Sequence, residues 1–318
     1  MHFVVTGGAG FIGSHLCDAL LADGHDVTAI DNFITGRPGN IAHLRDNASF
    51  RLVEHDITQE LPAKEQTSLG KVDAIYHLAS PASPADFTRI PLEIAIINSV
   101  GTRNVLEWAR SHEARYLLTS TSEAYGDPLE HPQREDYFGN VNTIGPRACY
   151  DEGKRFAEAI TSVYIREFRV DGRIVRIFNT YGPRMNPNDG RLPPQFISQA
   201  LRGEPMTIYG DGSQTRSFCY VSDMVSGLRA VMDAQPEVAR GKIFNVGNPD
   251  ERQVRAFAEL IRIISESNSE IEYRPALQDD PARRCPDISR ISATLGWRPV
   301  VSLVEGMART IEWFRTQI

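Results

Sequence analysis

Phe3-Val4-Val5-Thr6-Gly7-Gly8-Ala9-Gly10-Phe11-Ile12-Gly13-Ser14-His15-Leu16 is the stretch of sequence that decides the fold. A short β-branched run leads into glycines at positions 7, 10 and 13, where a strand would turn into a helix. The first glycine permits a tight turn, the second lets backbone N–H groups approach a pyrophosphate, and the third lets the helix pack closely on the sheet. The helix N-terminus then faces the anion. This pattern predicts a dinucleotide site.

An acidic residue follows the next predicted strand. Asp31 comes after residues 26–30, close to the ~20-residue spacing at which a carboxylate meets the adenosine ribose. A carboxylate there hydrogen-bonds the 2′-hydroxyl and repels a 2′-phosphate, so we expect NAD rather than NADP. The alternative is a solvated residue at a strand end. Further on, Asp56 in His55-Asp56-Ile57 is a plausible adenine contact, although alone it is a weak indication.

The first half of the chain alternates short β-branched runs with amphipathic stretches, which is typical of a parallel sheet covered by helices on both faces. The predicted strands are residues 3–6, 26–30, 74–78, 115–119 and 173–177. We expect an α/β fold with a Rossmann-type, doubly wound parallel sheet and a smaller C-terminal substrate-binding domain. Residues 1–180 would form the NAD-binding domain and 181–318 the second, with about 215–247 returning to the first. The alternative for the C-terminal part is a packing cap without a ligand role.

Composition excludes several classes of function. The chain of 318 residues has 41% hydrophobic and 24% charged residues, and no window approaches the ~20 apolar residues of a membrane-spanning helix. Its four cysteines are scattered without a CxxC pair, and its net charge is −7. A zinc site and nucleic acid binding are therefore disfavoured. No export signal precedes the first strand, so we expect a soluble cytoplasmic protein without a metal, nucleic acid or membrane partner.

Two residues in a predicted helix form a candidate acid–base pair. In Tyr150-Asp151-Glu152-Gly153-Lys154, the i, i+4 spacing puts Tyr150 and Lys154 on one helix face. A tyrosine is a useful base only if its pKa falls from about 10 toward neutrality. A nearby ammonium, helped by a positive nicotinamide ring, favours the phenolate. The same pair occurs by chance on ordinary helix surfaces, so it gains weight from the glycine motif.

Hydroxyl groups and a carboxylate follow the strand that begins at Arg115. In Thr119-Ser120-Thr121-Ser122-Glu123, these groups lie where the strand ends in the ligand crevice of a doubly wound sheet. The alternative is a polar turn in which Ser and Thr bond their own backbone. In the second domain, the arginines that could hold a diphosphate are Arg184, Arg191, Arg216, Arg283 and Arg284. A single arginine is more often a surface charge than a ligand, and that is the alternative for each of them.

From Gly7 to the final Ile-Glu-Trp-Phe, the chain resembles the UDP-glucuronate decarboxylase (UDP-xylose synthase) family of extended short-chain dehydrogenase/reductases. The segments that carry the resemblance are residues 76–84 (YHLASPASP), 120–123 (STSE), 145–155 (GPRACYDEGKR), 176–185 (RIFNTYGPRM) and 278–281 (QDDP). The resemblance implies an NAD-dependent enzyme that binds a UDP-sugar and forms a homodimer through helices of the first domain.

The resemblance also implies roles for individual residues. Thr121 would hydrogen-bond the sugar C4 oxygen, Ser122 and Glu123 would serve the C5/C6 end, and Arg284 would handle the carboxylate or reprotonation. The predicted catalytic residues are Thr121, Ser122, Glu123, Tyr150, Lys154 and Arg284. Those predicted to bind NAD are Gly7, Gly10, Phe11, Ile12, Gly13, Asp31, Asn32, Asp56, Ile57, Leu78, Ser80, Asn98, Tyr150, Lys154 and Thr180. Those predicted to bind the substrate are Pro81, Asn179, Arg191, Tyr209, Arg216 and Arg284.

The expected reaction is decarboxylation of UDP-glucuronic acid through a 4-keto intermediate, giving UDP-xylose or releasing the UDP-4-keto-pentose. In related 4,6-dehydratases the position of Ser122 is typically an aspartate that protonates the departing hydroxyl, which serine cannot do. Related 4-epimerases lack the Ser-Glu pair. A 4-epimerase or 4,6-dehydratase remains the alternative enzyme, and a non-catalytic NAD-binding regulator is the alternative from another class.

Overall fold

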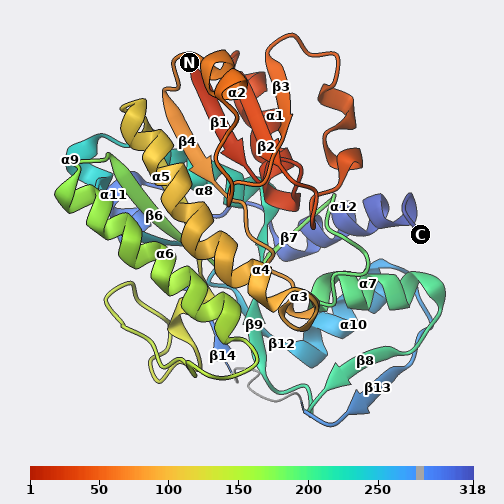
Figure 1. Cartoon of the computed structure of the whole chain (residues 1–318). Coiled ribbons are helices and arrows are strands. Elements are labelled where there is room, and N and C mark those ends of the chain that lie inside the picture. Colours follow the sequence, from red (N-terminus) through yellow and green to blue (C-terminus); the bar gives the residue numbers. More distant parts are fainter. Residues whose placement is uncertain (277–282) are drawn as a thin grey trace.

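The computed structural model describes residues 1–276 and 283–318 and is built on a seven-stranded parallel sheet (Figure 1). The strand order is β11-β6-β5-β4-β1-β2-β3. The strands are β1 (His2–Thr6), β2 (Asp26–Asp31), β3 (Phe50–Glu54), β4 (Ala74–His77), β5 (Arg115–Thr121), β6 (Gly172–Ile177) and β11 (Ile243–Val246). The order reverses beside β1, which makes the sheet doubly wound and confirms the predicted fold class.

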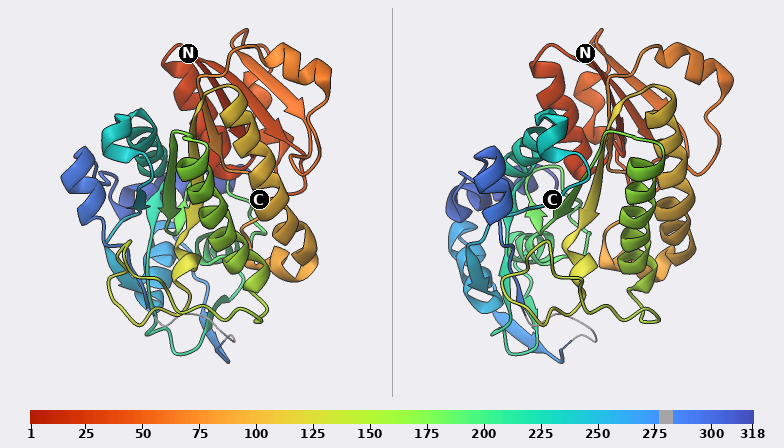
Figure 2. Two further views of the ribbon diagram at one scale, coloured as in Figure 1. Left: turned by 60° about the vertical axis from the view of Figure 1, so that its left-hand side comes forward. Right: turned by 90° about the vertical axis from the view of Figure 1, so that its left-hand side faces the viewer.

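Helices cover both faces of this sheet, as Figure 2 shows. One face carries α1 (Phe11–Ala22) and α8 (Val221–Asp233), and the other carries α4 (Pro91–Ile96), α5 (Thr102–Ser111) and α6 (Ala148–Glu167). In α6 the buried residues at positions 150, 151, 154, 157, 158, 161 and 164 form one face with the helical period. Shorter helices are α2 (Ala63–Leu69), α3 (Pro84–Arg89), α9 (Pro236–Ala239) and α11 (Ser289–Leu295).

The five strands expected from the sequence are all present, and the sheet has two more. Strand β3 lies at one edge, where only Val53 is buried, so its hydrophobic signal is weak. Strand β11 pairs with β6 at the other edge. Part of the segment 215–247 therefore returns to the main sheet, while Thr215–Ser217 does not. The division at residue 180 stays a prediction.

The second lobe is built from small sheets and three longer helices. Its helices are α7 (Leu192–Arg202), α10 (Val254–Ile264) and α12 (Leu303–Arg315). The small sheets pair β7 (Thr180–Tyr181) with β10 (Cys219–Tyr220), β8 (Met206–Tyr209) with β13 (Ile271–Arg274), and β9 (Thr215–Ser217) with both β12 (Glu251–Gln253) and β14 (Arg283–Arg284). Within the described residues, no helix is both long and apolar enough to cross a bilayer.

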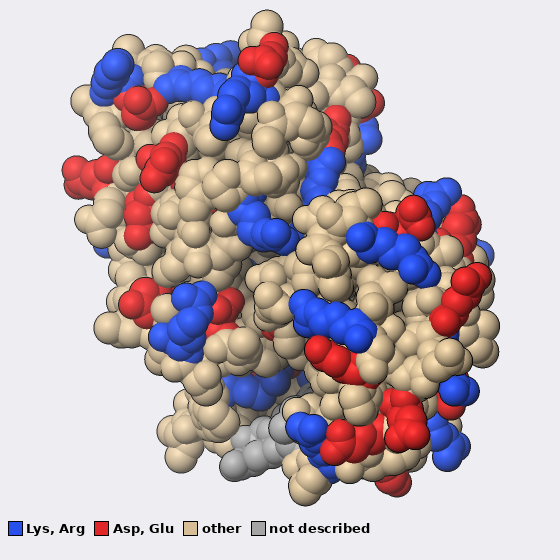
Figure 3. Space-filling model, turned by 90° about the vertical axis from the view of Figure 1, so that its right-hand side faces the viewer, with Lys and Arg blue, Asp and Glu red and all other residues tan. Residues whose placement is uncertain are grey.

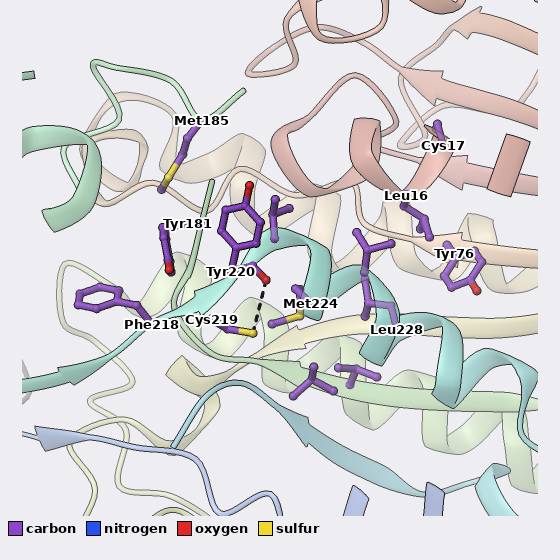
Figure 4. Close-up of a cluster of buried hydrophobic side chains, with 14 of the residues drawn as sticks. Leu16, Cys17, Tyr76, Tyr181, Met185, Phe218, Cys219, Tyr220, Met224 and Leu228 are labelled. Carbon is purple, nitrogen blue, oxygen red and sulfur yellow. Dashed lines mark hydrogen bonds between the residues drawn. The ribbon is translucent and has the colours of Figure 1, made fainter. Parts of the chain in front are cut away.

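One hydrophobic core joins the two lobes. Leu16 of α1 and Tyr76 of β4 belong to the same buried cluster as Met224 of α8 and Phe218 of the second lobe (Figure 4). Because interiors pack at nearly crystalline density, the lobes hold a fixed relative position. The cleft between them is therefore largely preformed.

Candidate active site

A cavity of about 400 Å³ opens between the carboxyl ends of β1, β4, β5 and β6 and the second lobe. Figure 3 shows a furrow between the two halves of one face, with Lys and Arg side chains beside it and charges of both signs over the rest. The predicted residues that line the cavity are Gly7, Gly10, Phe11, Ile12, Gly13, Leu78, Ser80, Thr121, Ser122, Glu123, Tyr150, Lys154, Asn179, Thr180, Arg191, Tyr209, Arg216 and Arg284.

A second cavity of about 70 Å³ continues past the glycine loop. Asp31, Asn32, Ile57 and Pro81 line it, together with residues shared with the larger cavity. Two predicted cofactor residues line neither space. Asp56 accepts a bond from its neighbour's backbone, Thr58 N, at 2.9 Å, and the buried Asn98 donates to the Ile94 carbonyl at 2.9 Å. Their roles stay predictions. Residues 278–281, which carry part of the family resemblance, lie outside the described residues.

The glycine loop is as tight as its sequence predicts. Gly7 has φ +74°, and a Cβ there would lie 2.8 Å from the backbone nitrogen of Ala79. A Cβ on Gly13 would lie 2.1 Å from the carbonyl oxygen of Gly7. Gly10 caps α1 without a side-chain bond, so the first N–H groups of the helix remain available to a ligand. These contacts leave room for a pyrophosphate and for no side chain.

Two arginine nitrogen atoms and one carboxylate near the glycine loop are suited to binding NAD. The Nη1 atoms of Arg37 and Arg184 are buried without a hydrogen-bond partner among the described residues, and both side chains line the large cavity. Asp31 accepts bonds from the backbone N–H groups of Ala9 (3.0 Å) and Phe33 (2.9 Å), which ties the glycine loop to β2. Each carboxylate oxygen keeps a lone pair for a ribose hydroxyl. The residues present therefore suit an adenine dinucleotide.

The predicted acid–base pair lies together on α6. Both side chains are buried, the Lys154 Nζ lies 6.0 Å from the centre of the Tyr150 ring, and Nζ donates to the Thr119 carbonyl at 2.9 Å. Phe87 stacks on the tyrosine ring, with 5.0 Å between the ring centres. The ring is thus fixed at the cavity wall.

The pKa of Tyr150 is raised, whereas the residue pattern predicts that it falls toward neutrality. Burial raises it to about 12, Thr121 lowers it by hydrogen bonding, and the charge of Glu123 raises it. Burial also lowers the pKa of Lys154 to about 7, against the pull of Glu158. Desolvation is the largest effect on this pKa, so the surrounding side chains do not bring the phenol toward neutrality. That shift requires a further positive charge, which an oxidised nicotinamide ring carries.

Glu123 is held between two arginines. Its Oε1 lies 2.8 Å from Nη1 of Arg284, and its Oε2 lies 2.6 Å from Nη2 of Arg147. Burial alone would raise the pKa of this carboxyl, but the two guanidinium groups lower it to about 2. Arg284, only 2% exposed, also donates to Ser122 Oγ at 3.2 Å and to the Gly126 carbonyl at 3.0 Å. At neutral pH the site therefore holds an ionised carboxylate beside two guanidinium cations.

The remaining second-lobe arginines divide into two groups. Arg191 pairs with Asp189 (Nη2 to Oδ2, 2.8 Å), and Arg216 donates to the Thr215 carbonyl at 2.8 Å; both line the cavity. Arg283 does not line it and instead lies 3.7 Å from Glu251, with an exposed side chain. Adjacent residues of a strand point to opposite faces. Among the described residues Arg283 therefore lies outside the cavity, and its role in holding a diphosphate stays a prediction.

Three residues that contribute to the site were not singled out from the sequence. Arg147 binds Glu123, Phe87 stacks on Tyr150, and Arg37 faces the dinucleotide cradle. Arg147 comes three residues before Tyr150, at the start of the same helix. This proximity in the sequence is the signal that could have identified it. Nothing local marked Phe87 or Arg37, because their partners are distant in sequence.

Comparison with known proteins agrees with this geometry. Residues 3–247 match the model of the NAD dependent epimerase/dehydratase family. A UDP-glucuronic acid decarboxylase 1 of Danio rerio is 50% identical over 315 residues, covering 99% of this chain and 73% of that protein. One from Arabidopsis thaliana is 50% identical over 318 residues, covering 100% and 71%.

Solved structures show the same fold. The UDP-glucose 4-epimerase of Thermotoga maritima, determined with UDP-glucose, has a TM-score of 0.90 and 31% identity and covers 100% of this chain and 99% of its own. The UDP-glucuronic acid 4-epimerase of Bacillus cereus, determined with UDP-glucuronic acid and NAD, has a TM-score of 0.90 and 29% identity over all of both chains. The chain belongs to the NAD dependent epimerase/dehydratase family and, within it, to the UDP-glucuronic acid decarboxylases. The resemblance seen in the sequence is confirmed, and so is NAD as the cofactor.

Proposed function

We propose that this chain removes carbon dioxide from UDP-glucuronic acid through a 4-keto intermediate. The product is UDP-xylose or, if the site opens early, the UDP-4-keto-pentose. The observation that carries the proposal is the ionised Glu123 bracketed by Arg284 and Arg147 beside Tyr150. A substrate carboxylate needs such cations, and a 4-ketone β to that carboxylate accepts the electrons of the breaking C5–C6 bond.

The residues act in sequence around the sugar ring. Tyr150 takes the proton of the C4 hydroxyl, with Thr121 bonded to the same oxygen. Bound NAD supplies the acceptor, and later the donor, of the C4 hydride. Arg284 and Arg147 hold the carboxylate until carbon dioxide leaves. Arg191 and Arg216 offer planar forks suited to the diphosphate.

Glu123 has a defined part in this scheme. Its low pKa keeps it ionised, so it cannot protonate a departing hydroxyl as a dehydratase acid must. Ser122 beside it has no acidic proton to offer. As a carboxylate, Glu123 instead orients Arg284 and can polarise water near C5. Because neither Ser122 nor Glu123 can supply that proton, the pair favours decarboxylation over dehydration.

A 4-epimerase is the second candidate, because both solved relatives described above are 4-epimerases and one was determined with UDP-glucuronic acid. Purified protein with NAD should be offered UDP-glucuronic acid and, separately, UDP-glucose. The proposal predicts a product that has lost carbon dioxide from the first and no change in the second. A C4 epimer of unchanged mass would replace the proposal with the epimerase.

A homodimer through the outer faces of α4 and α6 belongs to the same proposal. These adjacent helices lie on the face toward the viewer in Figure 1, and Leu92, Ile96, Phe156 and Val163 expose apolar side chains there. Phe156→Lys should shift the sedimentation coefficient to that of a monomer. Ile263→Lys on α10, also an exposed apolar side chain, is the matched control and should leave the dimer intact. Sedimentation of the Phe156→Lys variant as a dimer would contradict the proposed interface.

We also propose a cytoplasmic location, supported by the four cysteines, which are all free. Fractionation of the source cells tests it, and recovery from an oxidising compartment would contradict it.

A further inference from the structure

Asp151, next to Tyr150 on α6, is a buried carboxylate that the scheme above does not use. It is 6% exposed, and its Oδ1 has no hydrogen-bond partner among the described residues. Its Oδ2 lies 3.8 Å from Nε of Arg147, beyond hydrogen-bond distance. A buried carboxylate whose one ion pair lies beyond hydrogen-bond distance is costly when ionised, so its burial requires an explanation.

Asp151 is the end of a row of four charged side chains. Arg147 lies between Asp151 and Glu123, and Glu123 lies between Arg147 and Arg284. Protonation of Asp151 removes one negative charge from this row. A sugar carboxylate that binds beside Arg147 and Arg284 adds one negative charge, so the two events offset each other.

We propose that Asp151 is a proton-linked positioning residue, which takes up one proton when the carboxylate of UDP-glucuronic acid enters beside Arg147 and Arg284. It gives the proton up when that negative charge leaves as carbon dioxide. The inference rests on the proposed function, because it needs a carboxylate substrate at this site.

The electrostatic surroundings support the proposal. Burial first, and then the charge of Glu123, raise the pKa of Asp151 to about 7, against the opposing charges of Arg147 and Arg284. Glu152 adds a smaller upward shift. A second negative charge in the row raises this pKa further, so substrate binding and proton binding favour each other.

The proton balance of the reaction agrees with this linkage. The C5–C6 bond breaks, its electron pair passes to the enolate of the 4-ketone, and a new C5–H bond requires one proton. The proton taken from the C4 hydroxyl returns when the ketone is reduced, so decarboxylation consumes one proton in total. Asp151 binds one proton with the substrate and releases it when the carboxylate is lost. This number equals the one proton that decarboxylation consumes.

The test compares two ligands in a Tyr150→Phe background, which cannot remove the C4 proton and so leaves the substrate intact. With saturating NAD, the Kd of UDP-glucuronic acid should rise roughly 30-fold from pH 6 to 8.5. The reason is that the affinity falls nearly tenfold for each pH unit above about pH 7. The Kd of UDP-xylose, which has no carboxylate, should stay flat, and a flat Kd shows that the titration of Lys154 does not contribute to binding.

Adding Asp151→Asn, which is permanently neutral, should make the Kd of UDP-glucuronic acid independent of pH. Glu152→Gln removes the neighbouring charge, which pairs with Arg155 (3.4 Å) on the helix surface, and should keep the dependence. Calorimetry of the Tyr150→Phe protein in buffers of different ionisation enthalpy should show uptake of about one proton with UDP-glucuronic acid at pH 8 and none with UDP-xylose.

An unchanged pH dependence in the Asp151→Asn variant, or equal proton uptake with both ligands, would overturn the proposal. Unaltered affinity for UDP-xylose shows that the variant is folded, and the calorimetric result does not depend on that variant. Carbon dioxide release by the wild type is measured separately. Failure of that release with intact proton linkage would contradict the proposed function and leave the linkage standing.

Discussion

Oε1 of Glu123, just beyond the end of β5, lies 2.8 Å from Nη1 of Arg284 on β14. This ion pair joins the two lobes at the cavity that Tyr150 also lines. The proposed function depends on this pair, because Arg284 is buried, Glu123 is half-buried and both are charged at neutral pH.

Arg284→Lys keeps the charge but loses the fork that reaches Glu123, Ser122 and Gly126 together. We expect kcat for carbon dioxide release to fall by about 10²-fold or more. Arg283→Lys is the matched control, since that neighbour points away from the cavity, and its kcat should stay within about twofold. Equal effects of the two changes would show that Arg284 acts only through folding.

The ion pairs of Glu123 predict an acid-sensitive part of stability. The folded-state pKa of about 2 lies below the unfolded value of about 4.3, so the contribution is present above pH 4.3 and is lost as pH falls toward 2. The gap in unfolding free energy between wild type and Glu123→Gln should shrink by about 1 kcal/mol from pH 5 to 3.5. Urea titrations at both pH values measure it, and a constant gap would contradict the low pKa.

Tyr150→Phe removes the proposed base and little else, because the ring keeps its stacking on Phe87. We expect turnover to fall by about 10²- to 10⁴-fold while the Kd of UDP-glucuronic acid changes little. Single-turnover assays and calorimetry separate the two quantities. Tyr273→Phe, on exposed β13, is the control for loss of a hydroxyl. Retained turnover in Tyr150→Phe would assign the base to another group.

Gly13→Ala tests the dinucleotide cradle. The added methyl would lie 2.1 Å from the Gly7 carbonyl oxygen, so the loop must move, and NAD affinity should fall at least about tenfold. Gly39→Ala adds the same group where nothing lies within 4 Å and should bind NAD normally. Calorimetric titration with NAD measures the affinity of both variants. Normal binding by Gly13→Ala would mean that the pyrophosphate lies elsewhere.

The sequence predicted those parts of the molecule that depend on neighbouring residues. The glycine loop, the central strands and the Tyr150–Lys154 pair follow from spacing along one element, and the structure has them as expected. Strand β3 was missed because an edge strand exposes most of its side chains. The site roles remain predictions, although most of the residues line one cavity.

Contacts between residues far apart in the sequence could not be predicted from local sequence patterns. Arg147 lies within the quoted segment around Tyr150, yet only the fold brings it to Glu123. The difference between Arg283 and Arg284 depends on strand direction, which charge and composition do not reveal. The high pKa of Tyr150 arises from burial, and burial is a property of the folded protein.

The most direct test of the central claim is the fate of the sugar carboxyl carbon. Protein with NAD and UDP-glucuronic acid carrying ¹³C at C6 should release one equivalent of labelled carbon dioxide for each substrate consumed. Retention of the label in a nucleotide sugar, epimerised or unchanged, would contradict decarboxylation by this chain.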